Sequence, residues 1–242
     1  MSLYLYAIIN TLGYRPLHLT AHLHKMWEGA QTLYGTTPSQ TEVEVEQMIM
    51  DRLSEERMPR GGNTIELRAE QSGGHWTLSL HNPTPTIYEG YSYLSLRPSA
   101  VIINHELPFS RWRTSCSALT TEFGADFAER QEAGVAIRAD RNGNFVSCGD
   151  NPLFCVRNGV VYTLPVSSGG RDSVERDLMF RLCALAGVPI IESFTPIDNL
   201  GGEWDEIIIF EPCGVRSIGS CSGYTLDYST ALRLEQFVHK LL

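Results

Sequence analysis

Residues 140–165, DRNGNFVSCGDNPLFCVRNGVVYTLP, contain two turn motifs between short apolar runs. The first motif is RNGN, and the second is Asn158-Gly159, which separates NPLFCVR from VVYTLP. Asn-Gly between apolar runs is a strong hairpin signal, because its turn requires positive φ angles. This stretch therefore predicts a series of short strands joined by tight turns.

Helices are expected on either side of these strands. Residues 115–134 predict a helix, residues 173–188 an amphipathic helix that ends at Gly187, and residues 228–242 a closing helix. Residues 189–196 and 205–212 are apolar runs typical of strands.

The N-terminal part predicts a smaller unit. It combines a strand at 3–10, a helix at 19–35 capped by Thr20, a helix at 39–57 capped by Ser39 with Glu42, and a hairpin at 64–82. We expect a small α/β domain over residues 1–99, a link over 100–112 and a larger barrel-like α/β domain over 113–242. Ligands often bind between two such units.

Composition excludes several classes of function. The chain has 242 residues, of which 43% are hydrophobic, and its formal net charge of −9 argues against nucleic-acid binding. It contains no apolar run of about 18 residues that would span a membrane. The N-terminus lacks a secretory signal, and the six cysteines form no Cys-x-x-Cys pair, so we expect free thiols in a cytoplasmic protein.

Two clusters of reactive residues are weak evidence for a metal site or a catalytic nucleophile. His18, His22 and His24 lie close together, but His18 precedes the predicted helix, so we expect no metal site there. Cys116 and Ser117 lie near Arg113, but no motif ties a histidine or aspartate to them. A structural role at the start of a helix is the simpler interpretation.

The chain resembles the class IV aminotransferases, the fold-type IV enzymes that use pyridoxal phosphate. They include branched-chain and D-amino-acid aminotransferases and aminodeoxychorismate lyase. The resemblance rests on four segments in the family's order and spacing: NTLGYRPLHLTAHLHKM, RTSCSALTTEFGADFAERQEAGVAI, the opening stretch, and SVERDLMFRLCALAGVPIIE. It implies a two-domain fold and a homodimer.

The resemblance places Arg113 where the family has the lysine that binds pyridoxal phosphate as an imine. That lysine must be able to lose its proton, whereas arginine stays protonated and forms no such imine. Only two of the 19 basic residues are lysines, Lys25 and Lys240. By family geometry Lys25 would lie near the cofactor phosphate, and Lys240 lies on the closing helix.

Other cofactor contacts of the family are also altered. Ser147 matches the glutamate that faces the pyridine nitrogen, and it adds no negative charge. The family's phosphate contacts match Lys25, the helix start at Ser173 and Val174, and the pair Pro212 and Cys213. Lysine lacks the arginine fork, and proline has neither N–H nor hydroxyl.

Two hypotheses follow. In the first, the chain is a non-catalytic member of the family that binds a small metabolite, an amino acid or a partner protein in the interdomain cleft. In the second, it is an active pyridoxal-phosphate-dependent aminotransferase or lyase with an atypical site. The altered residues favour the first, because arginine cannot replace the lysine chemically.

Overall fold

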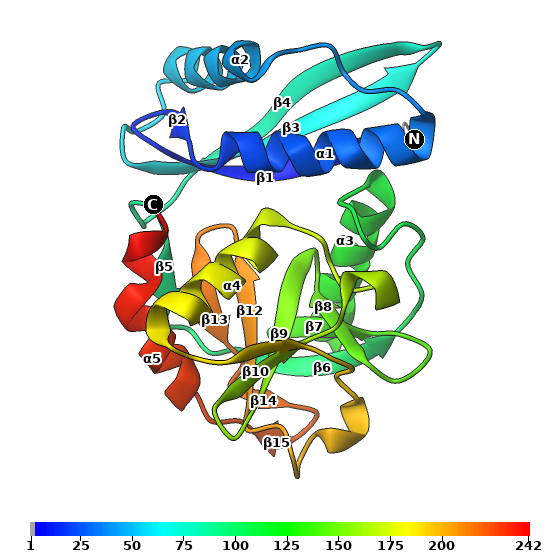
Figure 1. Ribbon diagram of the computed structural model, residues 1–242, viewed down its shortest axis with the longest axis vertical. Coiled ribbons are helices and arrows are strands. Elements are labelled where there is room, and N and C mark those ends of the chain that lie inside the picture. The colour runs from blue at the N-terminus through cyan, green and yellow to red at the C-terminus, as the bar shows by residue number, and fades with distance from the viewer. Residues whose placement is uncertain (1–2) are drawn as a thin grey trace.

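The computed structural model describes residues 3–242, and its N-terminal part is a four-stranded antiparallel sheet. In the order β2-β1-β3-β4, the strands are Arg15–Pro16, Tyr4–Leu12, Gly62–Ser72 and His75–Pro85. The predicted hairpin is β3–β4, which turns at Gly73 and Gly74 with φ angles of 58° and 85°. Helices α1 (Leu19–Tyr34) and α2 (Glu42–Glu55) lie along this sheet at one end of the molecule (Figure 1).

The capping residues of both helices differ from the predictions. α2 is capped by Thr41, whose side chain and Glu44 form a reciprocal capping box, in place of Ser39 and Glu42. α1 follows His18, which has a φ of 54°, and Thr20 lies inside the helix and donates to Glu42 instead. The segment before α2 contains two residues suited to capping, Ser39 and Thr41, whereas α1 begins one residue before Thr20, without a side-chain cap.

The remaining eleven strands form one larger mixed sheet. Its main path is β15-β14-β6-β7-β8-β9-β12-β13-β5, and β10 pairs with β9 and β11. In chain order, the strands are β5 (Ser92–Leu94), β6 (Ser99–Asn104), β7 (Val135–Ala139), β8 (Phe145–Cys148), β9 (Asn151–Arg157), β10 (Val160–Thr163), β11 (Ile190–Glu192), β12 (Glu206–Glu211), β13 (Gly214–Ser217), β14 (Ser220–Cys221) and β15 (Tyr224–Thr225). The predicted Asn158-Gly159 turn joins β9 to β10.

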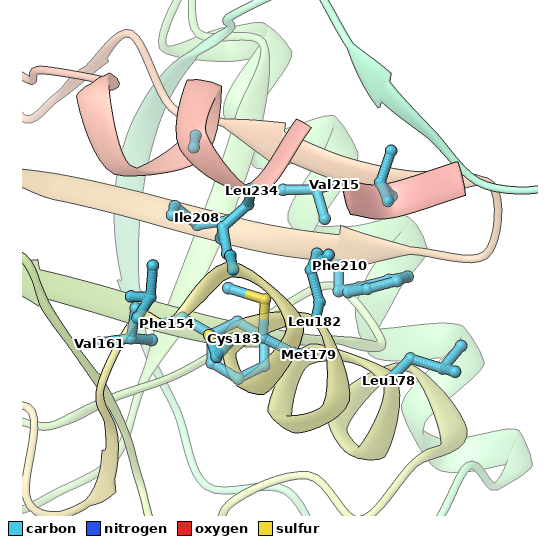
Figure 2. Packing of buried hydrophobic residues seen from close by; sticks show 14 of the residues in the cluster. Phe154, Val161, Leu178, Met179, Leu182, Cys183, Ile208, Phe210, Val215 and Leu234 are labelled. Carbon is cyan, nitrogen blue, oxygen red and sulfur yellow. The ribbon is translucent and has the colours of Figure 1, made fainter. Parts of the chain in front are cut away.

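This sheet separates two apolar cores. On one face, Phe154 and Ile208 pack against α4 (Val174–Ala186) and α5 (Ser229–Val238), as Figure 2 shows. On the other face, Ala100 of β6 packs in one cluster with Ile207 of β12, although three strands separate them in the sheet. The sheet therefore curls around this second core, which confirms the barrel-like α/β architecture.

Two segments before residue 113 belong to the larger sheet. β5 pairs with β13, and β6, which lies partly in the segment expected to be a link, pairs with β7 and β14. Three short 3₁₀ helices complete the fold: η1 (Val166–Ser168), η2 (Ile197–Asn199) and η3 (His239–Leu241). None of the helices in residues 3–242 is long and apolar enough to cross a membrane.

A backbone contact joins the two sheets beside α3 (Ser115–Arg130). The N–H of Tyr6 in β1 donates to the carbonyl of Arg113 at 3.1 Å, and Leu5 forms a β-bridge with Thr114. Arg113, to which the resemblance assigns the family's lysine position, is therefore held between the two parts of the fold.

The start of α5 is held by a buried carboxylate. Glu206 of β12 is fully buried, and its oxygens accept the N–H groups of Thr230 and Ala231 at 2.6 and 3.1 Å. We predict that Glu206→Ala lowers the free energy of unfolding by about 1.5–3 kcal/mol, because two N–H groups lose a charged acceptor. Urea unfolding measures this loss.

Glu203→Ala is the matched control for this substitution. The Glu203 side chain is 52% exposed and pairs with Arg157, so its removal should cost less than about 1 kcal/mol. Equal losses in the two variants would contradict the role assigned to Glu206.

Candidate functional site

Arg113 is buried just before α3, in the position that the resemblance assigns to the lysine. Its exposed fraction is 7%, and the next residue, Thr114, caps the helix together with Ser117. Arg113 Nη1 donates to Glu175 Oε1 at 2.9 Å, while Nη2 lies 3.4 Å from both the Asp150 carbonyl and Asn151 Oδ1. The guanidinium charge is thus neutralised inside the protein.

Glu175 places a carboxylate at the start of α4. It is the second residue of this helix, is 2% exposed and accepts a hydrogen bond from its own backbone N–H. Burial alone would raise the pKa of Glu175, but the charges of Arg113 and His22 and these hydrogen bonds outweigh it, so the pKa is lowered. A helix N-terminus attracts anions, and here the protein's own side chain supplies the anion.

A second buried ion pair lies next to the first. Arg171 Nη2 donates to Asp150 Oδ1 at 2.5 Å, and its Nη1 donates to the Trp112 carbonyl at 2.7 Å. The Tyr6 hydroxyl, from the N-terminal sheet, donates to the other Asp150 oxygen. Burial raises the pKa of Asp150, although Arg171 opposes the shift. Arg113, Arg171, Asp150 and Glu175, here called the ion cluster, carry two positive and two negative charges.

Lys25 lies beside the ion cluster but its amine is already paired. Lys25 Nζ is 2.5 Å from Asp172 Oδ1 and 2.9 Å from Asp177 Oδ2. Burial alone would lower the pKa of Lys25, but hydrogen bonds to these two aspartates raise it overall. Lys240 is exposed in η3, with its amine 4.9 Å from the centre of the Phe237 ring.

Four of the predicted site residues surround one small cavity. Lys25, Arg113, Ser173 and Val174 line a cavity of about 30 Å³, together with His22. Such a volume holds about one or two water molecules. Burial lowers the pKa of His22 to about 4, so its ring is neutral at pH 7.

The other predicted residues lie on neighbouring elements. Ser147 of β8 is fully buried, and its hydroxyl accepts a hydrogen bond from Arg138 Nε at 3.3 Å. Pro212 and Cys213 form the turn between β12 and β13, where the Cys213 carbonyl accepts the Ser92 N–H at 3.0 Å. Burial raises the pKa of the Cys213 thiol to about 11.

The other three residues of the ion cluster were not predicted from the sequence. Glu175, Asp150 and Arg171 were not among the predicted site residues, although all three lie in or next to the family-like segments. These three residues could have been noticed because they are charged, lie among glycines and apolar residues, and are close to the segments that match the family's cofactor contacts. Within residues 3–242, no group of three or more His, Cys, Asp or Glu side chains is arranged to hold a metal ion.

The charge of Glu175 should appear in the pH dependence of stability. At pH 7, we predict that Glu175→Gln lowers the free energy of unfolding by about 3–5 kcal/mol, because Arg113 stays buried without a counter-ion. The folded pKa of Glu175 lies below its ordinary value of 4.5, so its contribution is present above that value and is lost as the pH falls through the lowered pKa. Urea unfolding across this pH range measures the free energy of unfolding of Glu175→Gln and of the wild type, and the difference between them should shrink as the pH falls. Glu203→Gln, at an exposed position, serves as the control. A difference that does not change with pH would contradict the assignment.

Solved structures share this fold over nearly the whole chain. A candidate 4-amino-4-deoxychorismate lyase from Legionella pneumophila subsp. pneumophila str. Philadelphia 1 is 15% identical, with a TM-score of 0.84 over 99% of this chain and 91% of that one. The branched-chain aminotransferase from Thermoproteus uzoniensis, solved with norvaline, is 16% identical, with a TM-score of 0.83 over 99% of this chain and 85% of that one. A hypothetical aminotransferase from Mycobacterium tuberculosis, in its PLP-bound form, is 13% identical, with a TM-score of 0.80 over 98% of this chain and 88% of that one.

At these identities the structural likeness shows the fold alone. No curated protein matches the sequence. The family model for amino-transferase class IV matches residues 5–210, which is most of the chain. The protein therefore belongs to the class IV aminotransferase family.

Proposed function

We propose that this protein is a member of the class IV aminotransferase family that does not use covalently bound pyridoxal phosphate and is not a transaminase. One observation carries this proposal: Arg113, to which the resemblance assigns the family's lysine position, is neutralised by Glu175, a buried residue at the start of α4. The pair joins the two places at which the family holds the aldehyde and the phosphate of its cofactor.

The chemistry of the amine supports the proposal. The family's lysine acts after losing a proton, which a guanidinium does not do near neutral pH. The raised pKa of Lys25 keeps its amine protonated between Asp172 and Asp177. No described residue thus offers a free amine to the ion cluster, since the other lysine, Lys240, is exposed in η3.

The residues that match the family's phosphate contacts also support the proposal. A phosphate at the start of α4 would face the Glu175 carboxylate, and like charges at close range repel. Lys25, which matches the family's phosphate-binding arginine, is held by two aspartates, and the cavity that Lys25 lines has a volume of about 30 Å³. The residues present do not fit pyridoxal phosphate.

The residues that match the family's contact with the pyridine nitrogen differ in charge from those of the family. Ser147 carries no negative charge, and its hydrogen-bond partner is the Arg138 guanidinium. A positive charge beside the ring nitrogen disfavours its protonated form, which the family's chemistry uses as an electron sink.

The second hypothesis is an active pyridoxal-phosphate-dependent aminotransferase or lyase with an atypical site. Membership in the family favours it, but it requires the ion cluster to open and a lysine to enter the cavity. A small metabolite or amino acid in the interdomain cleft, a homodimer and a cytoplasmic location remain predictions.

Incubation with pyridoxal phosphate followed by borohydride reduction tests the proposal. We expect no stoichiometric adduct in the folded protein, because neither lysine amine is free in the ion cluster. Peptide mass spectrometry is decisive because Lys25 and Lys240 are the only lysines, and Lys240→Arg removes surface modification as a control. Stoichiometric modification of Lys25, with a visible absorption band that shifts on adding an amino acid, would support the second hypothesis.

Arg113→Lys distinguishes two explanations for the expected absence of an adduct: that only the lysine is missing, or that other residues fill the site. We expect no adduct at position 113, because the new amine would stay protonated beside Glu175 and the cavity remains too small. A stoichiometric adduct at this position would mean that the loss of the lysine alone accounts for the loss of cofactor binding.

A further inference from the structure

A second cavity lies within the larger part of the fold, and one of its lining residues, Asn151, also contacts Arg113. Its volume is about 190 Å³, against about 30 Å³ for the cavity beside Arg113. Residues of α3, β7, β8 and β12 and the segment after β6 form its walls, which include His105, Leu107, Val135, Arg138 and Ile209.

Arg138 brings a buried positive charge without a counter-ion to this cavity. Its exposed fraction is 5%, and its one hydrogen bond runs from Nε to the Ser147 hydroxyl at 3.3 Å. Arg138 Nη2 is buried without a partner, and within residues 3–242 no carboxylate lies within 4.0 Å of the guanidinium nitrogens. A buried unpaired cation is costly unless something else satisfies it.

The nearby acidic groups are committed elsewhere. Asp140 Oδ1 accepts the N–H groups of Asn142 and Asn144 in the turn after β7, at 2.9 and 2.8 Å. Glu106 Oε1 accepts the backbone N–H of Arg141 at 3.0 Å. Arg138 therefore differs from Arg113, Arg171 and Arg176, which are also buried but pair with carboxylates.

His105 adds a second unsatisfied group to the same cavity. Both of its ring nitrogens are buried and have no hydrogen-bond partner. Burial and the charge of Arg138 lower the pKa of His105, so the ring is neutral at pH 7 and offers one N–H donor.

The rest of the lining is apolar or already bonded. Leu107, Val135 and Ile209 supply aliphatic surface. Glu211 also lines the cavity, but both of its oxygens accept hydrogen bonds from Arg216, at 2.6 and 3.0 Å. The hydroxyls of the cavity-lining residues Ser117, Thr120 and Thr121 donate to backbone carbonyls.

We propose that this cavity binds a small organic carboxylate, whose carboxylate group accepts hydrogen bonds from Arg138 Nη2 and the His105 ring and whose apolar body packs against Leu107, Val135 and Ile209. The ligand carries no ammonium group, because the one carboxylate lining the cavity is held by Arg216. This site uses none of the residues of the ion cluster, and Arg138, which also bonds Ser147, is the group that it shares with the function proposed above.

Isothermal titration calorimetry with three compounds that share one carbon skeleton but differ in charge tests whether the cavity selects a carboxylate. We expect saturable one-to-one binding of 3-methylbutanoate, and binding weaker by about ten-fold or more for 3-methylbutanamide and L-valine, because a hydrogen bond to a charged group is lost or an ammonium is buried unpaired. This comparison uses the unaltered protein. Binding of all three with equal affinity, or no saturable binding of 3-methylbutanoate, would overturn the proposal.

Substitutions test the position of the site. Arg138→Met should weaken 3-methylbutanoate binding by about ten-fold or more. Arg141→Met, at a side chain 82% exposed on the following turn, should leave binding unchanged. Unchanged binding in a folded Arg138→Met protein would overturn the proposal, as would inorganic phosphate that binds to the unaltered protein and excludes 3-methylbutanoate.

Discussion

A buried ion pair between Arg113 and Glu175 is the constraint on which the rest of the site depends. The resemblance assigns the family's lysine position to Arg113, whose permanent charge needs a counter-ion because a lone buried cation is costly. Glu175 supplies that charge at the start of α4, where the helix dipole also favours an anion. Each of the two residues neutralises the other, which is why we propose that this pair, and not an external anion, occupies the site.

The surrounding contacts extend this constraint to both parts of the fold. Asp150 accepts hydrogen bonds from Arg171 and from Tyr6, so the N-terminal sheet is tied to the β8–β9 turn. The Tyr6 N–H also binds the Arg113 carbonyl. These contacts therefore join the two parts of the fold. Because this contribution to stability does not depend on a reaction, it would preserve the architecture in a family member that is not a transaminase, as we propose for this chain.

Much of the fold was predictable because it rests on local signals. Asn158-Gly159 gave the β9–β10 turn, and the apolar spacing of residues 173–188 gave α4 with its end at Gly187. Order along the chain also brought Lys25, Arg113, Ser173 and Val174 to one cavity. The predicted caps were wrong because Ser39 and Thr41 could both cap α2, and because α1 begins before Thr20 at a residue that makes no side-chain cap. The pairing of Arg113 with Glu175 was not predicted, because it joins residues 62 positions apart and depends on how α3 and α4 meet.

A double-mutant cycle on Arg113 and Glu175 tests the central claim most directly. The free energy of unfolding is measured at pH 7 for Arg113→Met, Glu175→Leu and the double variant. The account predicts that each single change costs about 3–5 kcal/mol, and that the double variant loses less than the sum of the two by at least about 2 kcal/mol. Additive losses, with no coupling between the two residues, would contradict the claim that they form one closed ion pair in the place of the cofactor.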